Sequence, residues 1–90
     1  MITLPIKKKW FDMIVSGEKP EEYRNITPHY NSLFRKHLRV PVRVCFRNGY
    51  RADSPRIEKT VIPRIGYGNT QWGAEFGVKY FVLAIQEEHQ

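Results

Sequence analysis

The stretch Ser16-Gly17-Glu18-Lys19-Pro20-Glu21-Glu22-Tyr23-Arg24 contains the expected end of a helix, a turn and the start of a strand. Gly17 follows an apolar pattern of helical spacing, at the position where a left-handed backbone often ends a helix and glycine adopts it without steric cost. Pro20 disfavours the helical conformation of Lys19, the residue before it. The chain is therefore expected to leave the helix through a turn and to continue as a strand.

Three charged residues of this stretch are expected to lie close together. Glu22 and Arg24 are two residues apart, so they share one face of the strand, and Tyr23 points to the other face. Lys19, at the mouth of the turn, can lean towards the same face as Glu22. Two cations and an acid can bind an anion or take part in proton transfer. Alternatively, Glu22 only neutralises Lys19 and Arg24 in a partly buried salt-bridge network.

The same residues carry a resemblance to a known family. Gly17, Lys19, Glu22 and Arg24 match the pattern Gly-x-Lys-x-x-Glu-x-Arg, and in this the chain resembles the ASCH domain family, which has a small PUA-like β-barrel. That family places the motif directly after a first helix near the N-terminus, and the same order is expected here. The resemblance implies an RNA-binding protein in which the motif lines a cleft.

A second reading of the resemblance is a small enzyme. Some ASCH-like proteins are regarded as ribonucleases or as amidohydrolases of N4-acylated cytidines, with the motif lysine in catalysis. The resemblance then implies that Lys19 acts as a base or nucleophile, with its pKa lowered by burial beside Arg24. In the amidohydrolase branch a threonine stands where this chain has Glu22, so that nucleophile is missing, and Glu22 could instead act as a general base on water. RNA and a modified nucleoside therefore both remain candidate partners.

Length and composition predict one domain over residues 1–90 with a single hydrophobic core, since 41% of the residues are hydrophobic. The single cysteine, Cys45, excludes an internal disulfide and fits the reducing cytoplasm. The histidines and this cysteine lack the spacing of zinc ligands, so we expect neither a metal nor another cofactor. The longest apolar run, residues 80–85, is too short to span a membrane.

Positive charge is concentrated in the middle third of the chain. Residues 35–64 contain nine Lys and Arg but only Asp53 and Glu58, and the remaining residues carry slightly more acids than bases. This distribution is expected if one side of the domain faces a polyanion such as RNA, or it forms a general solubilising surface. Arg43 and Arg47 should lie on one face of a strand, where they could follow phosphates.

Alternating and helical patterns together predict an α+β fold, in which two helices pack on a mainly antiparallel curled sheet. Helices are expected at 7–16 and 28–38, and strands at 2–4, 42–47, 57–65 and 78–85 in addition to the strand of the motif. Asn48-Gly49 predicts a tight hairpin after the 42–47 strand, with the return strand beginning at Tyr50. Pro63 suggests a sheet edge or a bulge.

The loop 66–73 is rich in glycine and carries two aromatic residues, Tyr67 and Trp72. It matches neither a P-loop nor a dinucleotide-binding fingerprint. Either ring could stack on a base of RNA, or both could close one end of the barrel.

Overall fold

The computed structural model describes residues 1–87, and within them two helices pack on a five-stranded sheet. The elements in chain order are β1 (Ile2–Pro5), α1 (Lys8–Ser16), β2 (Glu21–Asn25), α2 (Pro28–Phe34), the 3-10 turn η1 (Arg35–His37), β3 (Val42–Arg47), β4 (Arg56–Tyr67), the 3-10 turn η2 (Thr70–Trp72) and β5 (Lys79–Ile85). The last residues of the polar tail expected at 87–90 lie outside the described part. In residues 1–87 neither helix is long and apolar enough to cross a membrane.

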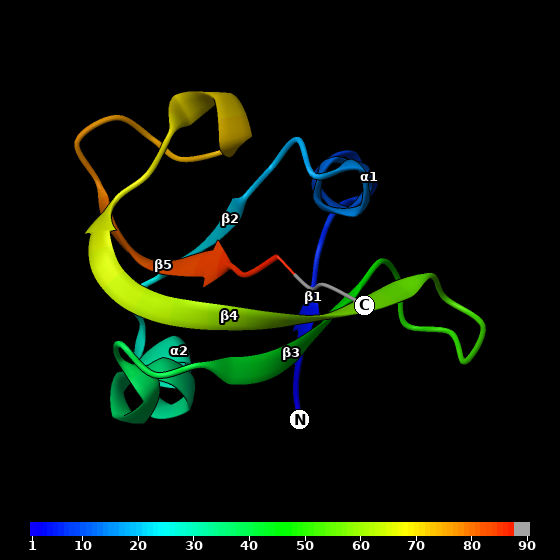
Figure 1. Cartoon of the computed structure of the whole chain (residues 1–90), viewed down its shortest axis with the longest axis horizontal. Helices are drawn as coiled ribbons and strands as arrows, with labels where there is room; N and C mark the ends of the chain where they lie inside the picture. Colours follow the sequence, from blue (N-terminus) through cyan, green and yellow to red (C-terminus); the bar gives the residue numbers. More distant parts are fainter. Residues whose placement is uncertain (88–90) are drawn as a thin grey trace.

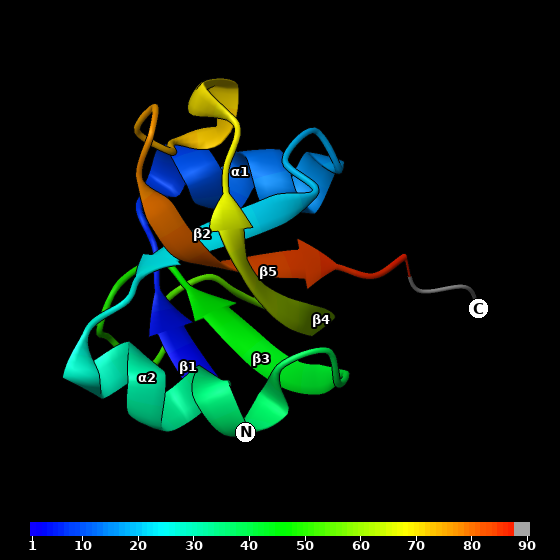
Figure 2. The ribbon, with the colours of Figure 1, turned by 90° about the vertical axis from the view of Figure 1, so that its left-hand side faces the viewer.

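The sheet has the strand order β1-β3-β4-β5-β2, in which β1 runs parallel to β3 and the other neighbours are antiparallel. It curls into a half-barrel, as Figure 1 shows most clearly for β4. Helices α1 and α2 lie at opposite ends of the curled sheet (Figures 1 and 2). The expected α+β fold is thus confirmed. Because β1 and β2 are the two edges of the described sheet, the barrel stays open between them.

The main core lies on one face of the sheet and follows the alternation of its strands. Val44 and Phe46 of β3 point to the same face as Phe81 and Leu83 of β5, where they meet Phe34 of α2. Burying a side chain of this size stabilises a fold by about 1.5 to 3 kcal/mol. A smaller cluster on the other face contains Tyr23, Ala74, Tyr80 and Val82. The last strand is therefore buried on both faces along residues 80–83.

The ends of the helices follow local sequence signals. Gly17 ends α1 in a left-handed conformation with φ of 85°, and its N–H donates to the carbonyl of Ile14 at 3.1 Å. Thr27 caps α2 by accepting a hydrogen bond from the N–H of Tyr30 at 3.2 Å, with Pro28 in the first turn. The helix expected over 28–38 is shorter than predicted, because it tightens into η1 after Phe34.

The prediction of a tight hairpin at Asn48-Gly49 is wrong. The connection between β3 and β4 spans residues 48–55, and the N–H of Asn48 pairs with the carbonyl of Pro55 at 2.9 Å. The side-chain amide of Asn48 donates to the carbonyl of Ile6 at 2.9 Å. This asparagine thus fastens the loop to the segment between β1 and α1, instead of forming a two-residue turn.

The proline in β4 does not interrupt the strand. Pro63 lies beyond the last residue pair between β3 and β4, Val42 with Val61. Its carbonyl accepts a hydrogen bond from the N–H of Arg39 at 2.8 Å, so its backbone groups point to the side where β3 has ended. The missing N–H of proline therefore removes no sheet hydrogen bond, and the predicted edge exists locally.

Candidate functional site

The motif residues form a connected and buried charge cluster. One carboxylate oxygen of Glu22 lies 3.2 Å from the ammonium of Lys19, and the other lies 2.7 Å from Nη2 of Arg24. Lys19 is only 1% exposed, Glu22 7% and Arg24 9%. The spacing along β2 therefore brings the three side chains together as the sequence predicted, with one net positive charge when all are ionised.

Lys19 is enclosed on all sides. Its ammonium donates a hydrogen bond to the carbonyl of Trp72 and lies 4.9 Å from the ring centre of Trp10 and 4.8 Å from that of Tyr23. Burial lowers the pKa of Lys19 below its ordinary value, and the carboxylate of Glu22 partly opposes this effect. Lys19 thus fastens the turn after α1 to the loop that contains η2.

Arg24 joins the two open edges of the sheet. From β2, its Nη2 donates to the carbonyl of Pro5 at the end of β1 at 2.7 Å, and its Nη1 donates to the hydroxyl of Tyr30 in α2 at 3.0 Å. The Nε of Arg24 is buried and has no acceptor among the residues that the structure describes. One guanidinium therefore links β2 to β1 and to α2 across the gap, and its Nε stays unpaired inside the protein.

The opposite face of β2 holds the loop after β4. The hydroxyl of Tyr23 donates to Glu21 at 2.6 Å and accepts from the N–H of Asn69 at 2.9 Å. Glu21 also pairs with Arg64 at 3.2 Å. Burial raises the pKa of Tyr23 above its ordinary value, so the hydroxyl stays protonated and keeps both hydrogen bonds.

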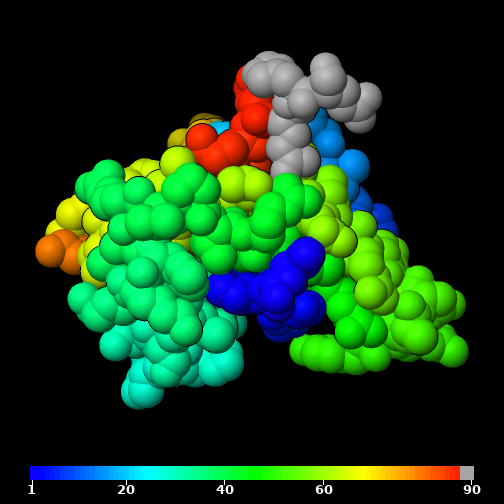
Figure 3. Space-filling model, turned by 60° about the horizontal axis from the view of Figure 1, so that its bottom comes forward, coloured from blue at the N-terminus to red at the C-terminus, as the bar shows by residue number. Residues whose placement is uncertain are grey.

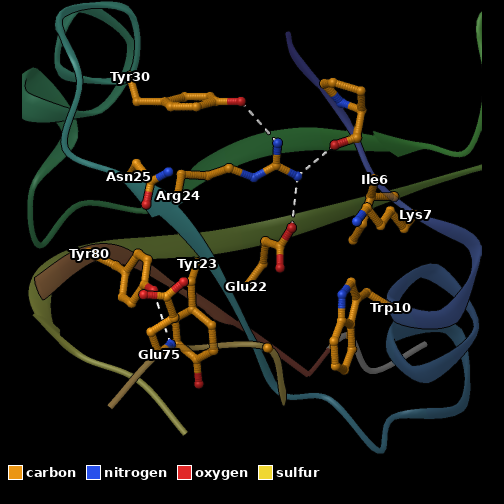
Figure 4. A pocket seen from close by; sticks show the side chains of 12 residues that line it. Ile6, Lys7, Trp10, Glu22, Tyr23, Arg24, Asn25, Tyr30, Glu75 and Tyr80 are labelled. Carbon is orange, nitrogen blue, oxygen red and sulfur yellow. Dashed lines mark hydrogen bonds and ion pairs between the residues drawn. The ribbon is translucent and has the colours of Figure 1, made fainter. Parts of the chain in front are cut away.

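A cleft with a volume of about 440 Å³ opens at the gap between β1 and β2. Figure 4 shows Glu22 and Arg24 in its centre, with Tyr30 on one side and the rings of Trp10, Tyr23 and Tyr80 on the other. Cavities of about 300 to 1,000 Å³ with a few convergent polar groups are typical ligand sites. The cleft is therefore the candidate binding site of this domain.

Charges around the cleft are nearly balanced. Lys7 and Arg24 contribute cations, and Glu22 and Glu75 contribute acids. Arg24 already pairs with Glu22, and the additional positive charge of Lys19 lies behind Glu22, where the ammonium is buried and cannot contact an anion in the cleft. A flat, uncharged group with hydrogen-bonding edges suits this cleft better than a phosphate.

The other residues selected from the sequence lie outside the cleft. Gly17 serves as the C-cap of α1, and Tyr67 is 61% exposed at the end of β4. Trp72 packs against the smaller core cluster and reaches the motif only through its carbonyl. Arg43 contacts Thr60 and Glu58, and Arg47 donates to the carbonyl of Arg51, all on the face of β3 and its loop that is turned away from the main core. The structure thus separates the predicted basic face from the motif.

Several residues of the cleft could not be identified from the sequence. Trp10 and Tyr30 have the helical spacing of core residues, and both are partly buried against the core while their remaining surface lines the cleft. No sequence pattern pointed to Glu75 or to the carbonyl of Pro5, because their position at the site depends on contacts between distant segments.

Comparison of the chain with protein-family models, curated proteins and solved structures found no match. Among residues 1–87, no group of three or more His, Cys, Asp or Glu side chains is placed to hold a metal ion. Function is therefore inferred from the chemistry of the cleft, which is lined by aromatic rings and by the ion pair of Glu22 and Arg24.

Proposed function

We propose that this domain binds single-stranded or looped RNA by taking one unpaired base into the cleft between β1 and β2. The observation that carries the proposal is the arrangement of Trp10 and Tyr30 around Arg24 and Glu22 in a cleft of about 440 Å³. Sequence-specific proteins read RNA mostly at such unpaired bases, by stacking and by hydrogen bonds to their edges.

Each part of the cleft has a role in this proposal. Lys19 covers part of the Trp10 ring and Phe34 covers part of the Tyr30 ring, and the parts that line the cleft can pack against a base, a contact worth roughly 1 to 3 kcal/mol. Glu22 and Arg24 present polar groups to the cleft, and the carboxylate of Glu22 accepts a hydrogen bond from an exocyclic amine. The near balance of charge favours a base over a phosphate at this point.

Lys19 acts as a positioning residue in this proposal. Its ammonium holds the carboxylate of Glu22 on one side and the carbonyl of Trp72 on the other. It also presents a cation to the ring of Trp10 from inside the protein. The resemblance to ASCH domains is supported by this grouping of the motif residues beside a cleft, and we propose the same family assignment.

The proposal is tested by nuclear magnetic resonance titration of the labelled domain with a single-stranded oligoribonucleotide and with the matching duplex. We expect the single strand to shift the indole N–H of Trp10 and the side-chain amide of Asn25, both of which line the cleft. Trp10→Ala should weaken binding by roughly fivefold or more, and Trp10→Phe should retain most of it. Equal shifts with the duplex, or shifts that avoid the cleft, would contradict the proposal.

A small hydrolase of RNA or of a modified nucleoside is the second candidate. The observation in its favour is the lowered pKa of Lys19 beside the carboxylate of Glu22, a combination that can activate a base or a nucleophile. Against it, Lys19 is 1% exposed and reaches the cleft only through Glu22. Binding therefore uses the observed geometry directly, whereas catalysis by Lys19 requires the loop around Trp72 to move.

Lys19→Arg separates the two candidates. Wild type and variant are incubated with a short RNA and with N4-acetylcytidine over a pH series, and products are followed by chromatography. Arginine stays protonated at working pH, so it can be neither base nor nucleophile. Wild-type turnover that rises with pH and disappears in Lys19→Arg would establish the hydrolase.

A further inference from the structure

A second groove, with a volume of about 380 Å³, lies beside the cleft. It is lined by Pro5, Ile6, Lys7, Asn48, Gly49 and Tyr50. The residues 5–7 line both cavities, so they form a ridge between them. The loop 48–55 forms the far wall and projects from the body of the domain, as Figures 1 and 3 show at the right-hand side.

The second groove has a fixed floor. The amide of Asn48 donates to the carbonyl of Ile6 at 2.9 Å, and the N–H of Ile6 donates to the carbonyl of Arg47 at 3.0 Å. The projecting loop is therefore tied to the ridge at its base.

Lys7 is the cation on the ridge. Of the three lysines in sequence there, Lys8 pairs with Asp12 at 2.6 Å and Lys9 lies 4.6 Å from the ring centre of Trp10. Lys7 is exposed and makes no ion pair with any residue in the range 1–87. No side chain caps the start of α1 next to it, and the first turn contains no acid. An anion on the ridge would therefore meet an unpaired ammonium and the positive end of the helix dipole.

Tyr50 supplies an aromatic surface to the second groove. Its side chain lines the groove, and the residue is 86% exposed. The ring therefore contributes little to the core and is available to stack on a base.

We propose that two successive nucleotides of a single strand straddle this ridge. One base occupies the cleft, the next base stacks on Tyr50 in the second groove, and the phosphate that joins them binds Lys7. The inference rests on the proposed RNA binding and extends it. Three neighbouring features support it. The aromatic cleft lies on one side of the ridge, the unpaired Lys7 lies on the ridge, and the exposed ring of Tyr50 lies on the other side.

The experiment compares binding of ribonucleosides with binding of dinucleoside monophosphates to the full chain, by magnetic resonance titration. Wild type should bind dinucleosides more tightly than nucleosides and should show shifts at Gly49 and Tyr50 only with dinucleosides. Tyr50→Ala should weaken dinucleoside binding by about fivefold or more and leave nucleoside binding unchanged, whereas Tyr50→Phe should behave as wild type. These two variants are at an exposed position, so loss of folding does not confuse the result.

The charge on the ridge is tested with a longer single strand. Lys7→Ala should lower the slope of log affinity against log salt by about 0.7, the value expected for one phosphate. Lys8→Ala removes the adjacent lysine, which is paired with Asp12 and lines neither cavity, and should leave dinucleoside binding unchanged. If the domain bound nucleosides and dinucleosides with equal affinity, the proposed role of the second groove would be wrong and the proposed function would remain. Absence of binding by any nucleoside, dinucleoside or longer strand would overturn both.

Discussion

Glu22 is the shared partner of two buried cations, and this sets the energetics of the site at the level of single residues. Burial of a charge is costly unless it is paired and hydrogen-bonded. Lys19 and Arg24 each bind one oxygen of this carboxylate, and each also donates to a backbone carbonyl, of Trp72 and Pro5 respectively. The cluster is therefore sensitive to which of its members is removed.

Glu22→Gln should destabilise the domain more than Lys19→Met. The first change leaves two buried cations facing a neutral amide, and breaking a buried pair from one side costs about 3 to 5 kcal/mol. The second keeps most of the side-chain volume and leaves Glu22 paired with Arg24, so its cost is mainly the unsatisfied carbonyl of Trp72, about 1 to 3 kcal/mol. Thermal unfolding followed by circular dichroism measures both, with about 4 to 8 °C of Tm for each kcal/mol. Equal melting temperatures in the two variants would contradict a buried cluster.

Tyr23→Phe should change the pH dependence of stability above pH 10. The folded protein keeps the phenolic proton because burial raises the pKa of Tyr23, whereas in the unfolded chain a tyrosine loses its proton near pH 10. The unfolded state then binds fewer protons, so this group lowers the free energy of unfolding as the pH rises through about 10. Wild type should be the more stable protein at neutral pH, through the hydrogen bonds of the hydroxyl to Glu21 and Asn69.

The measurement is urea unfolding of wild type and Tyr23→Phe between about pH 8 and pH 11. The gap between the two proteins should narrow from about pH 10 upwards. Lys19 is present in both proteins, so its own pH dependence cancels in the comparison. A gap that stays constant across this range would show that Tyr23 titrates normally.

At the scale of elements, the sequence predicts what local pattern decides and misses what distant contacts decide. The alternation of 42–47 predicted β3, the apolar run that ends at residue 85 predicted β5, and Gly17 predicted the end of α1. The hairpin prediction failed because the side-chain amide of Asn48 donates to the carbonyl of Ile6, a residue 42 positions away in the sequence. The motif cluster could be predicted because its spacing places Glu22 and Arg24 on one face. The cleft itself depends on the unpaired edges of β1 and β2, which no local pattern encodes.

Gly68→Ala should disturb the cleft, and Gly17→Ala should not. A Cβ at position 68 would lie 2.5 Å from the ring of Tyr23 and 2.7 Å from the side chain of Ala74, so the loop or the ring must shift. Such overpacking costs about 1 to 3 kcal/mol. At position 17 no atom lies within 4 Å of the added carbon, and the cost is only the left-handed backbone, about 1 to 2 kcal/mol.

The two glycine variants form a matched pair, because both lose a similar amount of stability for different reasons. Nucleoside titration and the chemical shifts of Trp10 and Tyr80 measure the effect on the cleft. We expect weaker binding and shifted signals in Gly68→Ala alone. Unchanged binding in Gly68→Ala would show that the position of Tyr23 does not shape the site.

Across the whole molecule, positive charge and the cleft are separated. The net charge of +6 arises from residues 35–64, whereas the cleft holds cations and acids in equal number. Arg43 forms an ion pair with Glu58 at 3.6 Å. Both side chains are about half exposed, so this ion pair is weak, and a phosphate can replace Glu58 as the partner of Arg43. A bound strand would therefore place a base in the cleft and its phosphates along the outside of the domain.

This separation predicts how RNA affinity responds to salt. With about four phosphates neutralised, log affinity should fall against log salt with a slope near −3 for a single strand. Replacing Arg43 and Arg47 together by Ala should reduce the steepness by about 1.4, because each lost cation releases one phosphate contact. The double change to Lys keeps both charges and should keep the slope, while circular dichroism shows whether the fold persists in each. If the affinity did not change between about 50 and 200 mM salt, the domain would not bind RNA through phosphate contacts. If the Ala and Lys variants instead shared the same reduced slope, the role of the two arginines would be to shape the loop that Arg47 contacts through the carbonyl of Arg51, and not to bind phosphate.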